Sequence, residues 1–497
     1  MTSIDISRPQ PIAKSVTAPA TKLGVGLLTA LVIGSMVGSG AFSLPQNMAA
    51  GAGATAIMIG WLITGVGMLA LAFVFQGLAV RKPELDAGPY AYARAGFGEF
   101  VGFNSAWGYW LSAWIGNVSY LVILFSALSY FIPAFGEGNT WQAILGASVV
   151  LWLVHFLVLA GVREAVIINA VTTIAKIASI LLFIGLVAAA FHWALFTGSA
   201  PAVSAVSATA AAVPPLGSLL EQVKSTMLVT LWAFIGIEGA SVFSARATKR
   251  TDVGVATISG LLICLGLYMA ISLLALGVMS QPELAVLKNP SMAGVLEKVA
   301  GPWGASLMNL GLVVSVLGAF LSWTLLAAEV PFVAAKGGTM PGALAAVNGK
   351  QAPVVSLWIT NGLVQIVLLG TYFYSATYTG LFTIASAAIM VPYVLSGAYA
   401  LKLAVTRESY VSSETTTRDI GIGLIATAYG LWLVYAAGPK YLFLCAMLYA
   451  VGIAVYLWTR NERNEPMFKG IELPLAGALG VAGVVAAYLL WSGGLSI

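Results

Sequence analysis

Long apolar runs recur along the whole chain and set its fold class. An α-helix needs about 20 mostly apolar residues to cross a bilayer. Thirteen such runs can be drawn, near residues 23–44, 54–80, 99–131, 141–160, 165–191, 222–245, 254–279, 302–334, 354–373, 380–404, 418–437, 439–459 and 471–492. Only 8% of the 497 residues are charged, against roughly 25% in soluble domains. We therefore exclude a soluble fold and predict an all-α polytopic membrane protein with about 12 or 13 spanning helices. The last run is rich in glycine and is either a spanning helix or a tail on the membrane surface.

Several functional classes find no support in the sequence. Cys264 and Cys445 both lie in apolar runs without a paired spacing, which argues against a disulfide framework and a zinc site. No zinc, phosphate-loop or nucleophile motif appears, so we expect no enzyme, no catalytic residue, no metal and no cofactor. The net charge of +5 comes from cations spread over many loops and does not indicate a nucleic-acid partner. The polar residues 1–22 precede the first run without a cleavage site, so we expect no cleaved signal.

The distribution of Lys and Arg predicts a cytoplasmic amino terminus. In this orientation 18 of these residues lie in inside segments and four in outside segments, as the positive-inside rule requires, and Lys176 remains inside a run. Residues 81–97 suggest a short amphipathic segment at the cytoplasmic surface, and residues 197–215 a flexible linker. The expected organisation is a cytoplasmic tail (1–22), a five-helix block (23–191), an extracytoplasmic loop (192–221), a second five-helix block (222–404), helices 11 and 12 (405–459) and a segment with a thirteenth helix (460–497).

Two of the runs are interrupted by glycine. The first contains GSMVGSG at residues 34–40, and such a break frees backbone groups that hydrocarbon cannot satisfy, which implies a polar cavity. Gly34 and Gly38 also fit a GxxxG packing pair, and the first run alone leaves this alternative open. The sixth run carries WAFIGIEG at residues 232–239, at the corresponding place of the second block. Paired interrupted helices favour an inverted-repeat transporter, in which a half-helix amino terminus receives an anionic group and unwound carbonyls receive an ammonium group. An amino acid carries both groups.

Three ionisable residues lie inside apolar runs: Lys176, Glu238 and Glu329. Each costs at least about 2.5 to 3.5 kcal/mol at the bilayer centre, so we expect a function for each in coupling or electrostatics. If all three are ionised their charges sum to −1, which a cationic amino acid or amine would neutralise. Alternatives stay open, namely an ion pair between Lys176 and Glu329, and a hydrogen bond from Glu238 that holds two helices together.

Aromatic and polar residues near the breaks are further candidates. Trp232 and Trp323 lie at mid-depth, where an indole face can stack on a guanidinium or ammonium group. Tyr109, Ser112 and Asn117 lie in the third run, although Ser112 and Asn117 are five positions apart and packing between helices is an equal alternative. His155 and His192 look interfacial and are not assigned a role.

Five stretches carry a resemblance to a known family: residues 33–45 (IGSMVGSGAFSLP), 88–98 (GPYAYARAGFG), 109–117 (YWLSAWIGN), 231–242 (LWAFIGIEGASV) and 322–336 (SWTLLAAEVPFVAAK). They resemble the amino acid, polyamine and organocation transporter superfamily, and most closely its basic amino acid/polyamine antiporters. Residues 322–336 and 391–402 (VPYVLSGAYALK) are more similar to the arginine/ornithine exchangers than to the arginine/agmatine ones.

The resemblance implies a LeuT-like fold of two five-helix inverted repeats with discontinuous helices 1 and 6. It also implies roles for individual residues. The cargo carboxylate would meet the N–H groups of Ser39 and Gly40, and its α-amino group the carbonyls of Met36, Trp232 and Ile235. The cargo side chain would stack on Trp323 and end in a pocket formed by Ser112, Ala113 and Asn117. Trp232 would cover the cargo, an outer gate would comprise Tyr109, Glu238 and Tyr393, and Lys176 would stand where sodium-coupled relatives bind the ion. Ala233 replaces a more polar residue seen in some relatives.

These expectations define a function and a rival. We expect a bacterial inner-membrane antiporter that exchanges a cationic amino acid, arginine in the first instance, for a related amine-bearing cation such as ornithine. The rival is a proton-coupled uptake permease for lysine, histidine or a neutral amino acid, with the proton carried by Glu238, Glu329 or Lys176. The expected partners are small amino acids or amines and the lipid bilayer, and a homodimer stays open.

Overall fold

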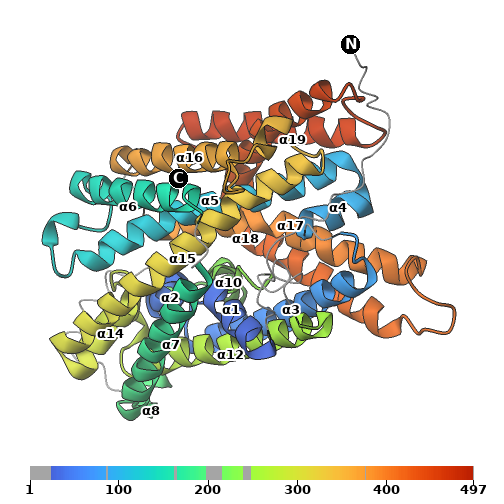
Figure 1. The fold of residues 1–497 in the computed structure, drawn as a ribbon. Helices are drawn as coiled ribbons and strands as arrows, with labels where there is room; N and C mark the ends of the chain where they lie inside the picture. The colour runs from blue at the N-terminus through green and yellow to red at the C-terminus, as the bar shows by residue number, and fades with distance from the viewer. Residues whose placement is uncertain are drawn as a thin grey trace.

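The computed structural model describes residues 24–85, 88–161, 165–197, 215–238, 248–374 and 377–495, with the backbone alone at residues 165–171 and 250. Over these ranges every named element is a helix, and one isolated bridge joins Val347 to Pro353 (Figure 1). Ten helices are long and apolar enough to cross a membrane, and a bent pair adds an eleventh span. The predicted all-α polytopic fold is confirmed.

The other spanning helices follow the predicted runs closely. They are α3 (Ala54–Arg81), α5 (Glu99–Leu128), α6 (Trp141–Leu159), α7 (Ala165–Ala189), α12 (Arg250–Ala275), α15 (Pro302–Lys336), α16 (Val354–Tyr374), α17 (Tyr378–Thr406), α18 (Thr417–Glu462) and α19 (Glu472–Trp491). Helix α18 contains two predicted runs, which meet at Gly438 with a φ of 73° just before Pro439. The glycine-rich last run forms α19, a helix of 20 residues that packs along α18.

The first span is broken, as predicted. Helix α1 (Val25–Met36) and helix α2 (Ser39–Ala49) meet at an angle of 48°. A β-carbon on Gly38, between them, would lie 2.8 Å from the hydroxyl oxygen of Tyr120. Glycine is therefore required here by close contact with α5 as well as by the break.

The sixth span ends its first helix early. Helix α10 (Leu219–Phe234) begins with a capping box between Ser218 and Glu221. Its 16 residues measure about 24 Å, less than the roughly 30 Å of hydrocarbon. The chain leaves the helix at Ile235, with a ψ of 129°, and Gly236 has a φ of 107°. The predicted second half of this span lies largely outside the described residues.

Short helices mark the two ends of the bundle (Figure 1). We call the end with α4 (Pro89–Phe97), where α5 begins and α15 ends, the α4 face. We call the other end, with α13 (Gln281–Ala285) and α14 (Ser291–Ala300), the α14 face. The remaining short elements are α8 (Trp193–Phe196), η1 (Pro133–Phe135) and η3 (Gly342–Ala345). In the predicted orientation the α4 face is cytoplasmic, and α4 is the short helix expected within residues 81–97.

Side-chain amides fasten α2 to the α14 face. Gln46 donates from Nε2 to the carbonyl oxygen of Ala285 at 3.1 Å, and Gln281 donates from Nε2 to the carbonyl oxygen of Ala49 at 2.6 Å. These bonds tie the second half of the broken span to α13. Each also satisfies a carbonyl oxygen at a helix end, where the helix itself offers no donor.

Candidate functional site

A narrow cavity lies where α5, the end of α10 and α15 meet. It has room for about one water molecule. The side chains and backbone that line it come from these three segments: Ser112, Ala113, Gly116, Tyr120, Trp232, Ile235 and Trp323. Five of the seven were predicted as site residues: Ser112, Ala113, Trp232, Ile235 and Trp323.

The cavity region contains buried polar atoms that lack a partner. Ser112 is 1% exposed, and its hydroxyl forms no hydrogen bond within the part of the chain described here. Asn117 is fully buried, and its Nδ2 atom donates to Thr324 at a long 3.5 Å while its Oδ1 atom has no partner among the same residues. Buried polar atoms are nearly always hydrogen-bonded, so both oxygens are acceptors that a ligand or water can satisfy.

Trp232 closes the cavity toward the α14 face. A β-carbon on Gly40 would lie 2.9 Å from its ring, and one on Gly116 would lie 3.0 Å from it, so the indole fits between two glycines. The ring stacks on Phe382 with centroids 5.7 Å apart. Its Nε1 atom donates to the hydroxyl of Tyr378 at 3.2 Å. We call Trp232, Tyr378 and Phe382 the α14-side layer.

Ser39 and the start of α2 join this layer. The hydroxyls of Ser39 and Tyr378 share a hydrogen bond of 3.0 Å. Helix α2 begins after Gly38 without a side-chain cap, so its first N–H groups are available to a bound group. A free helix amino terminus favours an anion. Met36, also predicted to contact cargo, is buried at the end of α1 but does not line the cavity.

Glu238 closes the opposite side. Its carboxylate accepts hydrogen bonds from the hydroxyls of Tyr109 and Tyr393, the latter at 2.8 Å, and the residue is 2% exposed. We call these three residues the α4-side layer. Tyr109 precedes Ser112 along α5, which runs away from the α4 face, so this layer lies between the cavity and that face. The three predicted gate residues do come together, but in the predicted orientation they form an inner layer, and the expected outer position does not fit.

The two broken spans touch each other. Ser35, in the last turn of α1, donates from its hydroxyl to the carbonyl oxygen of Gly236 at 2.8 Å and to that of Val32 at 2.9 Å. A β-carbon on Gly236 would lie 2.9 Å from the carbonyl oxygen of Ser35. The interrupted stretches therefore meet at one point beside the cavity.

Lys176 and Glu329 lie apart. Lys176 is fully buried and donates from Nζ to the carbonyl oxygen of Gly34 at 2.6 Å, just before the break in α1. Glu329 is exposed on α15, six residues beyond Trp323 and outside the cavity lining. The ion pair between Lys176 and Glu329 is therefore not formed. The reason is the length of α15, whose 35 residues extend about 52 Å and carry Glu329 toward the α4 face.

This placement changes the charge argument. The buried ionisable residues of the three are Lys176 and Glu238, whose formal charges cancel, so the predicted sum of −1 does not describe the buried region. The predicted cationic cargo would then be recognised by the aromatic side chains and the free Ser112 hydroxyl of the cavity.

A family model for amino acid permeases matches residues 23–463. The chain belongs to the amino acid permease family. The permease is 52% identical over 483 residues to the arginine/ornithine antiporter of Pseudomonas aeruginosa, covering 96% of this chain and 98% of that protein. It is 50% identical over 475 residues to a putative arginine/ornithine antiporter of Escherichia coli, covering 94% and 99%. It is 42% identical over 486 residues to the arginine/agmatine antiporter of Chlamydia pneumoniae, covering 97% and 99%. The predicted resemblance is confirmed.

Sequence reasoning missed parts of the site of this permease. Gly116 and Tyr120 follow Ser112 at intervals of four residues, so helical spacing alone places the three on one face of α5. Tyr378 and Phe382 gave no such signal. They lie in the first turns of α17, which begins two residues before the predicted run.

Proposed function

We propose that this permease exchanges arginine for ornithine across the bacterial inner membrane by alternating access, and that it is a carrier rather than an enzyme. The observation that carries the proposal is a cavity between two hydrogen-bonded layers, with the unsatisfied hydroxyl of Ser112 at its wall. The names of the relatives support the choice of cargo.

The proposed cargo lies with its α-carboxylate at the N–H groups of Ser39 and Gly40. The missing side-chain cap at the start of α2 supports this, because those N–H groups need an acceptor. The α-amino group would meet the backbone carbonyls of Met36, Trp232 and Ile235, where helices α1 and α10 end.

The distal cation of the cargo would occupy the α5 side of the cavity. Trp323 offers an aromatic face, and an interaction of this kind contributes about 2 kcal/mol or more where the cation is desolvated. Ser112 and Asn117 would supply acceptor oxygens, and Ala113 leaves room beside them.

Alternating access requires that each layer opens in turn. Opening toward the α14 face would separate Trp232 from Tyr378, and opening toward the α4 face would separate Glu238 from Tyr109 and Tyr393. In the proposed orientation the amino terminus and the α4 face are cytoplasmic. The bias of Lys and Arg supports this orientation, and the three bacterial relatives support the inner-membrane location.

Preloaded proteoliposomes test the proposal. We expect internal ornithine to stimulate uptake of labelled arginine at least about tenfold over empty vesicles, because in an exchanger only the cargo-loaded carrier switches from one open side to the other. Uptake into empty vesicles that responds to an imposed pH gradient would instead favour the proton-coupled permease.

Membrane voltage separates the exchange modes. Exchange of one singly charged cation for another moves no net charge, so the rate should be insensitive to an imposed potential. Exchange for a doubly charged amine moves one charge, worth about 2.3 kcal/mol per 100 mV.

A further inference from the structure

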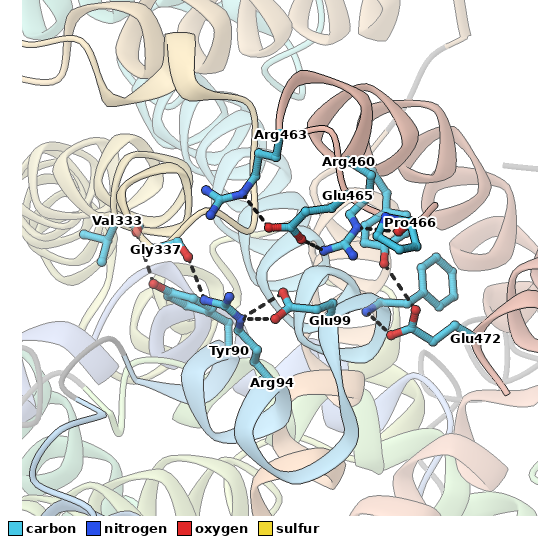
Figure 2. Close-up of polar contacts among 12 residues, drawn as sticks. Tyr90, Arg94, Glu99, Val333, Gly337, Arg460, Arg463, Glu465, Pro466 and Glu472 are labelled. Carbon is cyan, nitrogen blue, oxygen red and sulfur yellow. Dashed lines mark hydrogen bonds and ion pairs between the residues drawn. The ribbon is translucent and has the colours of Figure 1, made fainter. Parts of the chain in front are cut away.

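The last helix meets the cargo-binding helix at the α4 face. Glu472, the first residue of α19, is 5% exposed and lies at the beginning of α5. Its Oε1 atom accepts a hydrogen bond from the backbone N–H of Phe100 at 3.0 Å. Its Oε2 atom accepts from the backbone N–H of Lys469 at 2.9 Å and from the hydroxyl of Tyr456 at 3.4 Å. Figure 2 shows Glu472 among the polar contacts of this face.

Glu472 takes the place of a missing cap. The residue before α5 is Gly98, which supplies no side-chain hydrogen bond to the helix. A β-carbon on Gly98 would lie 3.2 Å from Oε1 of Glu472, so the carboxylate stands where a capping side chain would begin. A carboxylate at a helix amino terminus satisfies an orphan N–H group and interacts favourably with the helix dipole.

The opposite side of the same helix start is held by a second contact. Arg94 donates from Nε to both carboxylate oxygens of Glu99, at 3.0 and 2.9 Å, and from Nη1 to the carbonyl oxygen of Gly337 at 2.6 Å (Figure 2). Gly337 directly follows α15, which carries Trp323. The start of α5 is therefore fastened to α15 through Arg94 and to α19 through Glu472.

Helix α5 connects this start to the cavity. Ser112 follows Phe100 by 12 residues, about 18 Å along a helix, and lines the cavity together with Gly116 and Tyr120. Helix α5 is nearly enclosed by other helices, so a shift along or about its axis moves the whole row of side chains.

We infer that Glu472 is a positioning residue for exchange. By capping α5 from α19, it keeps the cavity-lining row of α5 in register with Trp323 and with the end of α10. This row comprises Ser112, Gly116 and Tyr120. Helix α19 thus acts on the cargo site from outside the two five-helix blocks. The inference rests on the proposed exchange function, and it assigns Glu472 no contact with cargo.

Three variants of the full chain test this role. E472A removes both acceptors, and E472Q keeps one oxygen to accept from Phe100 but loses the charge. The matched control is E465A, because Glu465 pairs with Arg460 and Arg463 on the same face and forms no hydrogen bond or ion pair with α5 within the described residues.

Two measurements distinguish positioning from general stability. Hydrogen exchange of the amides at residues 99–103 should become about fivefold faster in E472A, the factor expected for the loss of a helix cap. The KM for external arginine in preloaded proteoliposomes should rise by a similar factor while kcat changes less than twofold. E472Q should fall between E472A and the natural protein in both, and E465A should match the natural protein.

Unchanged amide exchange at the start of α5 in E472A and E472Q, or a KM equal to that of E465A, overturns the inference. The inference is also overturned if E472Q and E465A change kcat and KM to the same extent. If E472A cannot be purified intact, E472Q decides by the same criteria. A natural protein that exchanges no cationic amino acid would refute the proposed function, whereas the amide measurement still decides whether Glu472 caps α5.

Discussion

The ammonium group of Lys176 donates a hydrogen bond of 2.6 Å to the carbonyl oxygen of Gly34, immediately before the break in α1. Lys176 is fully buried, and the broken helix leaves carbonyl oxygens without helical partners. A covalently attached cation thus meets a backbone acceptor that a bound metal cation could otherwise satisfy. This geometry supports the expected place of Lys176, where sodium-coupled relatives bind the ion, and we therefore predict that exchange needs no sodium.

Lys176→Met should lower the arginine–ornithine exchange rate at least about tenfold, because it leaves the Gly34 carbonyl buried without a donor. The natural protein should exchange at equal rates in sodium and in choline buffers. Labelled-arginine uptake in preloaded proteoliposomes measures both. The control is Lys288→Met, since Lys288 is largely exposed and only pairs with Glu137 at 3.6 Å. A sodium requirement in the natural protein would refute this role for Lys176.

Gly236→Ala should abolish most exchange while the protein still inserts and purifies. The new β-carbon would lie 2.9 Å from the Ser35 carbonyl oxygen, at a φ of 107° that an L-residue rarely adopts. The control is Gly266→Ala, where nothing lies within 4 Å of the new atom. Equal exchange rates in the two variants would show that the contact between the broken spans is dispensable.

Trp323→Leu should weaken binding of arginine about tenfold or more, because the indole face lines the cavity. Glu329→Gln should change binding less than about twofold, since Glu329 is exposed and lies outside the cavity lining. Isothermal titration of the purified proteins with arginine compares the two. A large loss of affinity in Glu329→Gln would indicate that this carboxylate contacts the cargo.

Glu238→Gln should slow turnover more than it weakens binding. The carboxylate accepts two tyrosine hydroxyls in the closed α4-side layer, and an amide replaces one acceptor oxygen with a donor that faces a hydroxyl. We expect kcat for exchange to fall about tenfold with a smaller change in KM. Tyr393→Phe removes one of the two bonds and should have an intermediate effect. Natural kcat values in both variants would contradict the gating role.

Glu283 makes the stability of the α14 face depend on pH. Burial opposes its ionisation, but hydrogen bonds from Ser280 and the ammonium group of Lys298 outweigh this and lower the pKa of Glu283 below its ordinary 4.5. A lowered carboxyl pKa contributes stability above the ordinary value, and this contribution is lost as pH falls through the lowered pKa. Glu283→Gln should therefore cost about 0.5 to 1 kcal/mol at pH 7, and the difference from the natural protein should shrink below about pH 4.5. Melting temperatures in detergent at pH 7 and pH 4 measure this, with Glu137→Gln as the control at an exposed pair.

The spanning helices could be predicted because hydrocarbon leaves few alternatives to a helix of about 20 residues. The break at residues 34–40 could be predicted for the same reason, because the glycines there free backbone groups that hydrocarbon cannot satisfy. The depth and exposure of Glu329 could not be read, because its run extends beyond the membrane thickness and composition does not show where a helix emerges. The hydrogen bond between Trp232 and Tyr378 could not be predicted either, because the two residues lie 146 positions apart and meet only through the packing of their helices. The sequence motif does not show on which side of the cavity Glu238 lies, because this depends on the path of the chain after α10.

The α14-side layer has a consequence for the order of events during entry. Trp232 and Tyr378 share one hydrogen bond, both contact the ring of Phe382, and Tyr378 also bonds to Ser39. Parting these contacts moves only a few side chains, whereas rocking of helix bundles takes microseconds to milliseconds. A cargo molecule can thus bind and dissociate many times before the slower motion carries it across the membrane. Discrimination among similar metabolites would then be kinetic as well as structural.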